Sequence, residues 1–293
     1  MKEHSLKTRR KTILLTFDVE DWFQVENFKE YIPFSSWDSK ALRVEKNIHL
    51  ILDLLDSFKF KPKATFFILG WVAQRNPSLI RKIAQRGHEI ASHGRNHNLC
   101  TALSPKALEQ DLKDAKNLLE DITGEAVYGF RAPSFAVNDN ILKIIKKTGH
   151  MYDSSYNSFA MHGRYGKISL SPNQIGKSCL KIDNAFYEIP ISNLNWGRRV
   201  MPLGGGGYFR LFPLVLFLQG MNQVLKEEKT FTFYSHPWEF DPDQPKVNQA
   251  SRSFKFRHYV NQVSAAKKLK KMIENFKNCR FISCVNYIKS RTN

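Results

Sequence analysis

Apolar runs alternate with amphipathic stretches over the first half of the chain. Runs rich in β-branched and aromatic residues predict buried strands at Thr12–Phe17, Ala64–Leu69, His88–Ser92 and Val127–Phe130. Apolar residues at helical spacing predict a helix at Leu42–Phe58. Pro near the start and Gly at the end mark helices at Asn76–Gly87 and Ser104–Gly124, and Gly149 follows a further helix at Ile141–Lys147. Four successive strand–helix units favour a parallel sheet or barrel and an α/β fold class.

Beyond Met151 the alternation is less regular. Leu180–Ser192 is typical of paired strands, and Gly204–Gly207 predicts a flexible turn before an apolar helix from about Leu211. The last predicted elements are a strand, a helix and a strand, at Thr230–Ser235, Tyr259–Phe276 and Arg280–Val285. Because no Pro/Ser-rich linker separates two halves, we expect one domain over residues 8–290, with 245–293 a C-terminal helix–strand extension packed on it.

Composition excludes several classes of protein. The 293 residues are 42% hydrophobic and 25% charged, as in ordinary globular chains, which excludes a largely disordered one. The longest apolar stretch, Leu211–Leu218, contains Pro213 and is shorter than the ~20 residues of a membrane-spanning helix. Acidic residues from Asp18 onward interrupt the first apolar run too early for a signal-peptide core, so we expect a cytoplasmic protein.

Charge and cysteine content say less about the function. Lys and Arg number 45 and Asp and Glu 27, which gives 45 − 27 = +18, and this excess could serve nucleic acid, an anionic membrane or an acidic substrate. Only Lys267–Lys271 forms a basic run, which we interpret as a solvated helix face. The four cysteines show neither a CxxC pair nor a zinc-site spacing and are expected to be free thiols.

Polar residues follow the predicted strands. In a barrel of alternating strands and helices, the loops at the carboxyl ends of the strands form one mouth, where active sites lie. We therefore expect these groups to converge: Asp18, Glu20, Asp21, His93, His97, Arg131, Asp153 and His236.

Some of these residues suit a metal ion. His93 and His97, four residues apart, could lie on one face of a helical turn and bind one ion, or could be two surface histidines. With a carboxylate from the end of the first strand they would form a facial site with open positions. We expect one divalent ion, zinc first, with cobalt, manganese, nickel or iron as alternatives.

Two further groups suit proton chemistry. Arg131 could hold a carboxylate ionised, and His236 titrates near neutrality, although a surface ion pair and a turn-capping histidine are the alternatives. Several aromatic residues could form sugar-stacking walls or belong to the core: Phe17, Trp22, Phe135, Trp196 and Trp238.

Four ordered strings resemble a known family. TFDVED, SHGRNH, FRAPSF and SHPWE are similar to the signature motifs of polysaccharide deacetylases with the NodB homology domain, carbohydrate esterase family 4. YDSS, EIPIS, GGGGYFRL and HPWEFDPDQP resemble the exosortase-associated polysaccharide deacetylases of bacterial exopolysaccharide clusters. The resemblance extends from about Lys11 to the last predicted strand.

The resemblance implies a NodB-like distorted (β/α)₇ barrel and metal-dependent removal of N-acetyl groups from N-acetylhexosamine residues. By position, Asp18 would be the general base, His236 the general acid and Arg131 the residue that orients Asp18. His93 and His97 would bind the metal. The Ser134 amide would stabilise the oxyanion, with Pro133 and Trp238 beside the substrate.

Two departures from the family pattern affect the site. The family has adjacent aspartates, whereas this chain reads Asp18-Val19-Glu20-Asp21. Residues i and i+2 of a strand point the same way, so we expect Glu20 to be the metal ligand, with Asp21 the alternative. The family's fourth motif, an acid-and-tryptophan segment, is not recognisable, and Glu188–Trp196 is expected to replace it.

Two other functions stay open. The spacing of the acids also suits an amidase or cyclic-imide hydrolase of a small molecule, and the charge suits a non-catalytic carbohydrate- or polyanion-binding module. The expected partner is a polysaccharide or a lipid-linked oligosaccharide, with peripheral association at the inner membrane or a polymer-synthesis complex. No nucleic-acid partner is expected.

Overall fold

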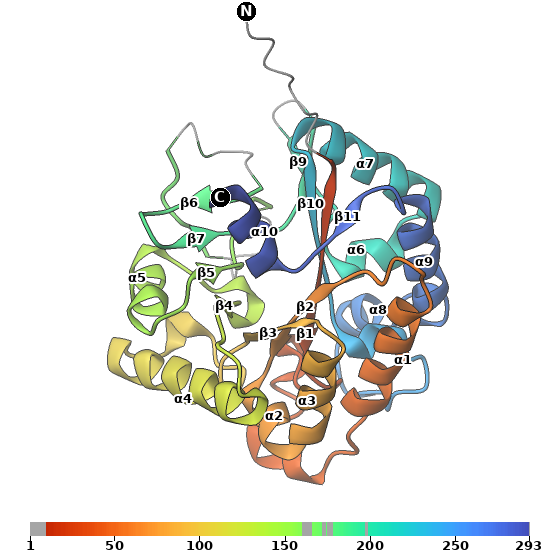
Figure 1. Ribbon diagram of the computed structural model, residues 1–293. Helices are drawn as coiled ribbons and strands as arrows, with labels where there is room; N and C mark the ends of the chain where they lie inside the picture. Colours follow the sequence, from red (N-terminus) through yellow and green to blue (C-terminus); the bar gives the residue numbers. More distant parts are fainter. Residues whose placement is uncertain (1–9, 160–165, 172–173, 175–177, 197–198, 293) are drawn as a thin grey trace, which may run out of the picture.

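The molecule is built on one curled sheet with helices around its outside (Figure 1). The computed structural model describes residues 10–159, 166–171, 174, 178–196 and 199–292, so the basic residues 1–9 lie outside the described part. The strand order is β10 (Thr230–Ser235), β1 (Thr12–Val19), β2 (Ala64–Ile68), β3 (Glu89–Ser92), β4 (Gly129–Phe130), β5 (Tyr152–Asp153), β7 (Tyr187–Glu188) and β6 (Leu180–Lys181). Only β6 and β7 pair antiparallel within this sheet. The predicted α/β class with a curled parallel sheet is confirmed.

Irregular backbone bridges the two ends of the parallel array. Ser192, shortly after β7, donates its backbone N–H to the Thr232 carbonyl of β10 at 3.3 Å. Its hydroxyl accepts from the Thr232 N–H at 2.9 Å, and its carbonyl accepts from the Gly204 N–H at 2.7 Å. The sheet thus curls into a distorted barrel whose closure depends on single hydrogen bonds rather than on a full ladder.

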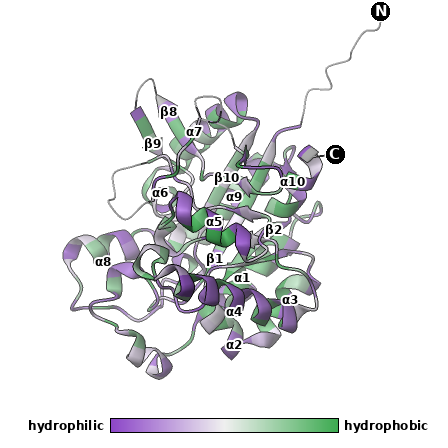
Figure 2. Ribbon diagram, turned by 90° about the vertical axis from the view of Figure 1, so that its left-hand side faces the viewer, coloured by the Kyte–Doolittle hydropathy of each residue, from purple (hydrophilic) through white to green (hydrophobic). Residues whose placement is uncertain are grey.

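Helices cover the outside of the sheet. They are α1 (Val44–Asp56), α2 (Gly70–Arg75), α3 (Pro77–Gln85), α4 (Pro105–Thr123), α5 (Asp139–Lys147), α6 (Gly206–Leu211), α7 (Leu214–Glu227), α8 (Arg252–Tyr259), α9 (Gln262–Asn275) and α10 (Cys284–Thr292). β8 (Asn193–Trp196) and β9 (Arg199–Pro202) pair antiparallel and form a separate two-stranded sheet. Figure 2 shows apolar residues toward the sheet and α8 at the margin of the molecule.

Local sequence explains the regular elements of the first half. All eight residues of β1 are buried, as expected of a central parallel strand with both faces covered. In α4 the Ser104 hydroxyl accepts from the Ala107 N–H, Pro105 occupies the first turn, and Gly124 ends the helix with φ 70°. Its buried residues, Leu108, Leu112, Ala115 and Leu119, follow the helical period.

The second half differs from the prediction in three places. Gly206 begins α6 instead of belonging to a flexible turn. The predicted helix Tyr259–Phe276 begins only at Gln262, as α9, because Asn261 before it adopts the left-handed conformation, φ 53°, and the preceding helix α8 was not predicted. The predicted last strand is only β11 (Arg280–Phe281), parallel to the start of β1, because Cys284 donates its N–H to Thr65 Oγ1 and begins α10.

The short α2 was also not predicted. The proposed boundaries of a single domain, residues 8–290 with an extension at 245–293, stay a prediction. No helix in the described ranges is long and apolar enough to cross a membrane.

Candidate active site

The carboxyl ends of the central strands surround one cavity of about 480 Å³. β1 supplies Asp18 and, just beyond its end, Glu20; β3 is followed by His93 and β10 by His236. The predicted site residues that line the cavity are Asp18, Glu20, His93, His97, Ser134, His236 and Trp238. The structure therefore brings together groups from distant parts of the sequence, as the barrel geometry predicts.

Glu20, His93 and His97 form a buried cluster suited to a metal. One ligand atom from each lies within 4.8 Å of the others. Glu20 Oε2 lies 2.8 Å from His97 Nε2 and has no hydrogen-bond partner among the described residues. Burial favours the neutral acid, but interactions with His97, His236 and His93 outweigh it and hold the pKa of Glu20 well below its usual range. A buried, ionised carboxylate oxygen that accepts no hydrogen bond is the kind of group that a cation compensates.

The protonation of His93 suits a ligand. Its Nδ1 lies 2.8 Å from the Arg131 carbonyl, which can only accept, so Nδ1 bears the hydrogen and Nε2 keeps its lone pair. Burial lowers the pKa of His93 to about 4, although Asp18 opposes this shift. The ring is therefore neutral at pH 7, which is the form that binds metals.

Asp21 lies apart from this cluster. Its Oδ1 accepts the Trp22 N–H at 2.8 Å, and its Oδ2 accepts those of Arg43 and Val44 at 2.7 and 2.9 Å. The carboxylate thus satisfies backbone donors at the start of α1, as acidic residues at helix N-termini do. Of the two acids considered, the structure groups Glu20 with the histidines.

Arg131 fixes Asp18. Its Nη1 donates to Asp18 Oδ1 at 2.6 Å, and both side chains are buried. Nε and Nη2 donate to the carbonyl and hydroxyl of Ser154 at 2.9 Å each, and the guanidinium lies 4.1 Å from the centre of the Phe67 ring. Nη1 also donates to Thr16 Oγ1 at 2.8 Å, so four hydrogen bonds hold the guanidinium. The second oxygen of Asp18 lies 3.9 Å from His236 Nε2, at the cavity.

A buried carboxylate holds His236 from the opposite side. Glu239 Oε1 lies 2.8 Å from His236 Nδ1, which leaves Nε2 directed to the cavity, 3.5 Å from Glu20 Oε1. Burial opposes a charge on the ring, but Glu20, Glu239 and Asp18 raise the pKa of His236 to about 9. The imidazole is therefore a proton donor at neutral pH.

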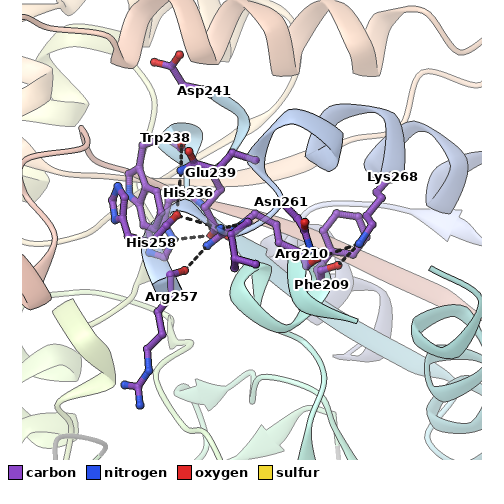
Figure 3. A network of polar contacts seen from close by, with 12 residues as sticks. Phe209, Arg210, His236, Trp238, Glu239, Asp241, Arg257, His258, Asn261 and Lys268 are labelled. Atoms are coloured by element: carbon purple, nitrogen blue, oxygen red, sulfur yellow. Dashed lines mark hydrogen bonds and ion pairs between the residues drawn. The ribbon is translucent and has the colours of Figure 1, made fainter. Parts of the chain in front are cut away.

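Arg210 completes this arrangement (Figure 3). It is 1% exposed, and its Nε donates to Glu239 Oε2 at 2.7 Å. Despite burial, Arg210 and His236 lower the pKa of Glu239 to about 2, so the carboxylate stays charged. The other guanidinium nitrogens donate to the carbonyls of Arg257, His258 and Val260, which joins α6 to the end of α8. Neither Glu239 nor Arg210 had a role assigned from the sequence.

The loop after β4 is strained. Pro133 begins a 3₁₀ helix, Pro133–Phe135, in which Ser134 and Phe135 have φ values of 54° and 58°. Such left-handed conformations of non-glycine residues cost about 1–3 kcal/mol each and persist only where the surroundings fix them. Here the Ala132 N–H donates to the Ser155 hydroxyl at 2.8 Å. The loop sets Ser134 and Phe135 in the cavity wall, while Pro133 is buried behind them.

Trp238 presents the edge of its ring, not a face, to the cavity. Its indole N–H donates to Glu20 Oε1 at 3.2 Å. The ring stacks between His236 and His258, with centroid distances of 4.9 and 4.1 Å. Both faces are covered, so the ring cannot stack on a sugar. Phe17 and Trp22 belong to the core, and the side chain of Trp196 is outside the described part.

Two local expectations were wrong. His93 and His97 lie in a loop, not on a helical turn, and positive φ values at Gly94 and His97 shape that loop. Asp153 is buried away from the cavity and shares a hydrogen bond with Glu188. Glu188 does not line the cavity either, and the acid bound to His236 is Glu239. The available signal was the position of Glu239, three residues after His236 at a helix start.

Comparisons with known proteins agree with this geometry. A family model for polysaccharide deacetylase matches residues 5–152, half of the chain, so the chain belongs to the polysaccharide deacetylase family. A model described as a domain of unknown function, DUF3473, matches residues 154–289.

Individual relatives match over a shorter range. The peptidoglycan-N-acetylglucosamine deacetylase of Bacillus cereus is 38% identical over 100 residues, 34% of this chain and 46% of that protein. The peptidoglycan-N-acetylmuramic acid deacetylase PdaC of Bacillus subtilis is 32% identical over 101 residues, 34% of this chain and 22% of that protein. The chain thus spans less than half the length of these curated relatives.

A solved structure shares the fold. A putative polysaccharide deacetylase from Mycobacterium smegmatis superposes over 95% of this chain and 89% of that one, with a TM-score of 0.60 and 18% sequence identity. At this identity the likeness concerns the fold alone.

Proposed function

We propose that the chain is a metal-dependent hydrolase that removes N-acetyl groups from N-acetylhexosamine residues of a bacterial exopolysaccharide or its precursor. The supporting observation is the meeting, at one cavity, of an Arg-bound carboxylate, a buried Glu/His/His cluster and a histidine held by a buried carboxylate. Acyl transfer from an amide needs these three parts: a base for water, a site for the oxyanion and an acid for the leaving amine.

Glu20, His93 and His97 would hold the divalent cation. The fit rests on the buried Oε2 of Glu20, which accepts no hydrogen bond and lies 2.8 Å from His97 Nε2, and on the neutral His93, whose Nδ1 bears the hydrogen. A cation there, with zinc first and cobalt, manganese, nickel or iron as alternatives, would polarise the acetamide carbonyl and lower the pKa of a bound water.

Asp18 is the general base of the proposed reaction. Arg131 holds its Oδ1, so Oδ2 can take a proton from the water that attacks the acetyl carbon. The backbone amide of Ser134, a residue of the cavity wall, would donate to the oxyanion of the tetrahedral intermediate.

His236 is the general acid. When the C–N bond breaks, the nitrogen takes the proton of Nε2 and leaves as an amine, while the acyl carbon leaves as acetate. Glu239 holds Nδ1, which keeps Nε2 directed to the cavity and favours the charged ring before transfer. The proton removed by Asp18 and the proton given by His236 balance the addition of one water.

A polymer suits the cavity better than a small cyclic amide. One wall contains Phe256, which is 59% exposed, so the cavity is open to a chain that extends beyond it. A purely binding module would not need the ion pair of Asp18 or the buried Glu239–Arg210 pair. The strings shared with exosortase-associated deacetylases favour exopolysaccharide, free or lipid-linked, as the natural substrate.

The test is acetate release from neutral N-acetylglucosamine oligomers. Metal-stripped protein should release no acetate, and one of zinc, cobalt, manganese, nickel or iron should restore release. Asp18→Asn should reduce restored release by about 10²–10⁴-fold, the usual contribution of a general base. Asp53→Asn, which changes an exposed acid paired with Arg86, is the control and should retain activity. Full activity in Asp18→Asn, or no release with any metal bound, would contradict the proposal.

A further inference from the structure

One face of α8 forms the outer wall of the cavity. Ser253, Phe256 and Arg257 line it, at positions i, i+3 and i+4, and so does Val260, just beyond the end of the helix. Residues at this spacing share one side of a helix. Tyr208 and Leu211 of α6 also line the cavity, and Arg210 joins the two helices through its bonds to α8 carbonyls.

Phe256 is an exposed aromatic residue at this wall. Its side chain is 59% exposed, and no ring of the described residues is recorded against it. Large exposed apolar side chains at a cavity indicate a surface that a ligand covers. A flat aromatic ring suits the C–H face of a pyranose, and Trp238 cannot serve this purpose because both its faces are covered.

Arg257 places an uncompensated positive charge beside Phe256. Its backbone carbonyl is bound by Arg210, but Figure 3 shows its guanidinium extending away from that network. No acid in the described part of the chain forms an ion pair with it. α8 contains Arg252, Lys255 and Arg257 and no acidic residue.

The acids that line the cavity are already engaged. Asp18 pairs with Arg131, Glu239 pairs with Arg210, and Glu20 lies against His97. Glu26, nearest the solvent, lies 3.8 Å from Lys29. An arginine at the wall is thus available for an anion, and its planar guanidinium fits a carboxylate through two parallel hydrogen bonds.

We propose that α8 forms a subsite for an acidic sugar next to the N-acetylhexosamine that reacts. Phe256 packs against the ring of the neighbouring residue, and Arg257 binds its carboxylate. This inference rests on the proposed deacetylase function and narrows its substrate to acidic heteropolymers. The net charge of +18 agrees with it, because a basic protein attracts a polyanion.

The test compares three probes: a neutral N-acetylglucosamine tetramer, a hyaluronan tetrasaccharide that alternates N-acetylglucosamine with glucuronate, and N-acetylglucosamine linked to a diphosphate. For the wild type we expect kcat/KM for acetate release to be about tenfold higher on the glucuronate-containing probe than on the neutral one. Arg257→Gln should reduce that ratio to near one. Lys255→Gln changes another basic residue of α8, whose Nζ donates to the Asn248 carbonyl before the helix; it is the matched control and should keep the ratio.

Three outcomes overturn the subsite. Equal kcat/KM on the neutral and acidic probes in the wild type excludes it, and so does a ratio that Arg257→Gln leaves unchanged. A preference for the diphosphate probe alone that Arg257→Gln abolishes would assign Arg257 to a lipid-linked phosphate instead.

A binding measurement separates this inference from the proposed function. In metal-loaded Asp18→Asn protein, calorimetric titration of the hyaluronan tetrasaccharide should give about tenfold weaker binding when Arg257→Gln is added. If no probe releases acetate but this loss of binding is seen, the deacetylase function fails and the acidic subsite stands. If acetate is released but Arg257→Gln does not weaken binding, the deacetylase function stands and the acidic subsite is excluded.

Discussion

The two halves of the chain form the site in different ways. Residues 12–153 contain the strands β1 to β5 in regular succession and supply Asp18, Glu20, His93, His97 and Arg131. The part after β5, which coincides with the domain of unknown function, has short and irregular elements apart from α7, α9 and β10. It nevertheless supplies His236, Glu239, Arg210 and the wall of α8.

The difference shows two ways to position a side chain. In the first half Asp18 lies at the end of the buried strand β1, between the parallel strands β2 and β10, and Arg131 holds its carboxylate. In the second half a series of charged groups positions His236. Arg210 binds three carbonyls and Glu239, and Glu239 binds His236. The base and the candidate metal ligands therefore belong to one half, and the proton donor to the other.

Substitutions of the adjacent acids Glu20 and Asp21, in the first half, should give the largest difference between two variants. Glu20→Gln should lower metal affinity by about a hundredfold or more, because losing a direct ligand exceeds the 10–100-fold typical of outer groups. Asp21→Ala should keep the metal but lower the free energy of unfolding by about 2–3 kcal/mol, since three backbone N–H groups lose their acceptor. Bound metal and urea denaturation measure the two effects. Loss of metal in Asp21→Ala alone would reverse the assignment.

In the second half, Glu239→Gln should reduce kcat by about 10–100-fold, within the range of acid–base contributions. The charge of Glu239 helps to raise the pKa of His236 to about 9, so the donor form persists up to that pH. Without that charge the pKa falls, and the alkaline limb of the pH–rate profile should move to lower pH. Glu45→Gln, on exposed α1 surface, is the control. A reduced rate with an unmoved limb would mean that Glu239 only supports the fold.

Two neighbouring glycines give the smallest expected effect. A Cβ at Gly206 would lie 2.3 Å from Glu239 Oε1, whereas one at Gly207 would meet nothing within 4 Å. Gly206→Ala should displace Glu239 and lower kcat several-fold. This corresponds to a rise of about 1 kcal/mol in the activation free energy. Gly207→Ala should instead raise the free energy of unfolding by about 0.5 kcal/mol, because alanine favours the helix. Equal kcat values in the two variants would weaken the role given to Glu239.

The sequence allowed much of the first half to be predicted. The buried run Thr12–Phe17 and the alternation of Asp18 and Glu20 are local patterns, so β1 and the side that its acids share follow from them. The contact of Arg210 with Glu239 joins residues 29 positions apart, and no local pattern predicts it. Likewise, the left-handed residues at His97 and Asn261 depend on tertiary contacts that periodicity does not reveal.

The most direct test of the whole account measures bound metal and acetate release together in two variants, His97→Ala and His236→Ala. We expect His97→Ala to lose both. We expect His236→Ala to keep the metal and to lose acetate release by about a hundredfold or more, as for removal of a general acid. If His236→Ala lost the metal as His97→Ala does, or retained full release, the division between a metal-binding half and a proton-donating half would be contradicted.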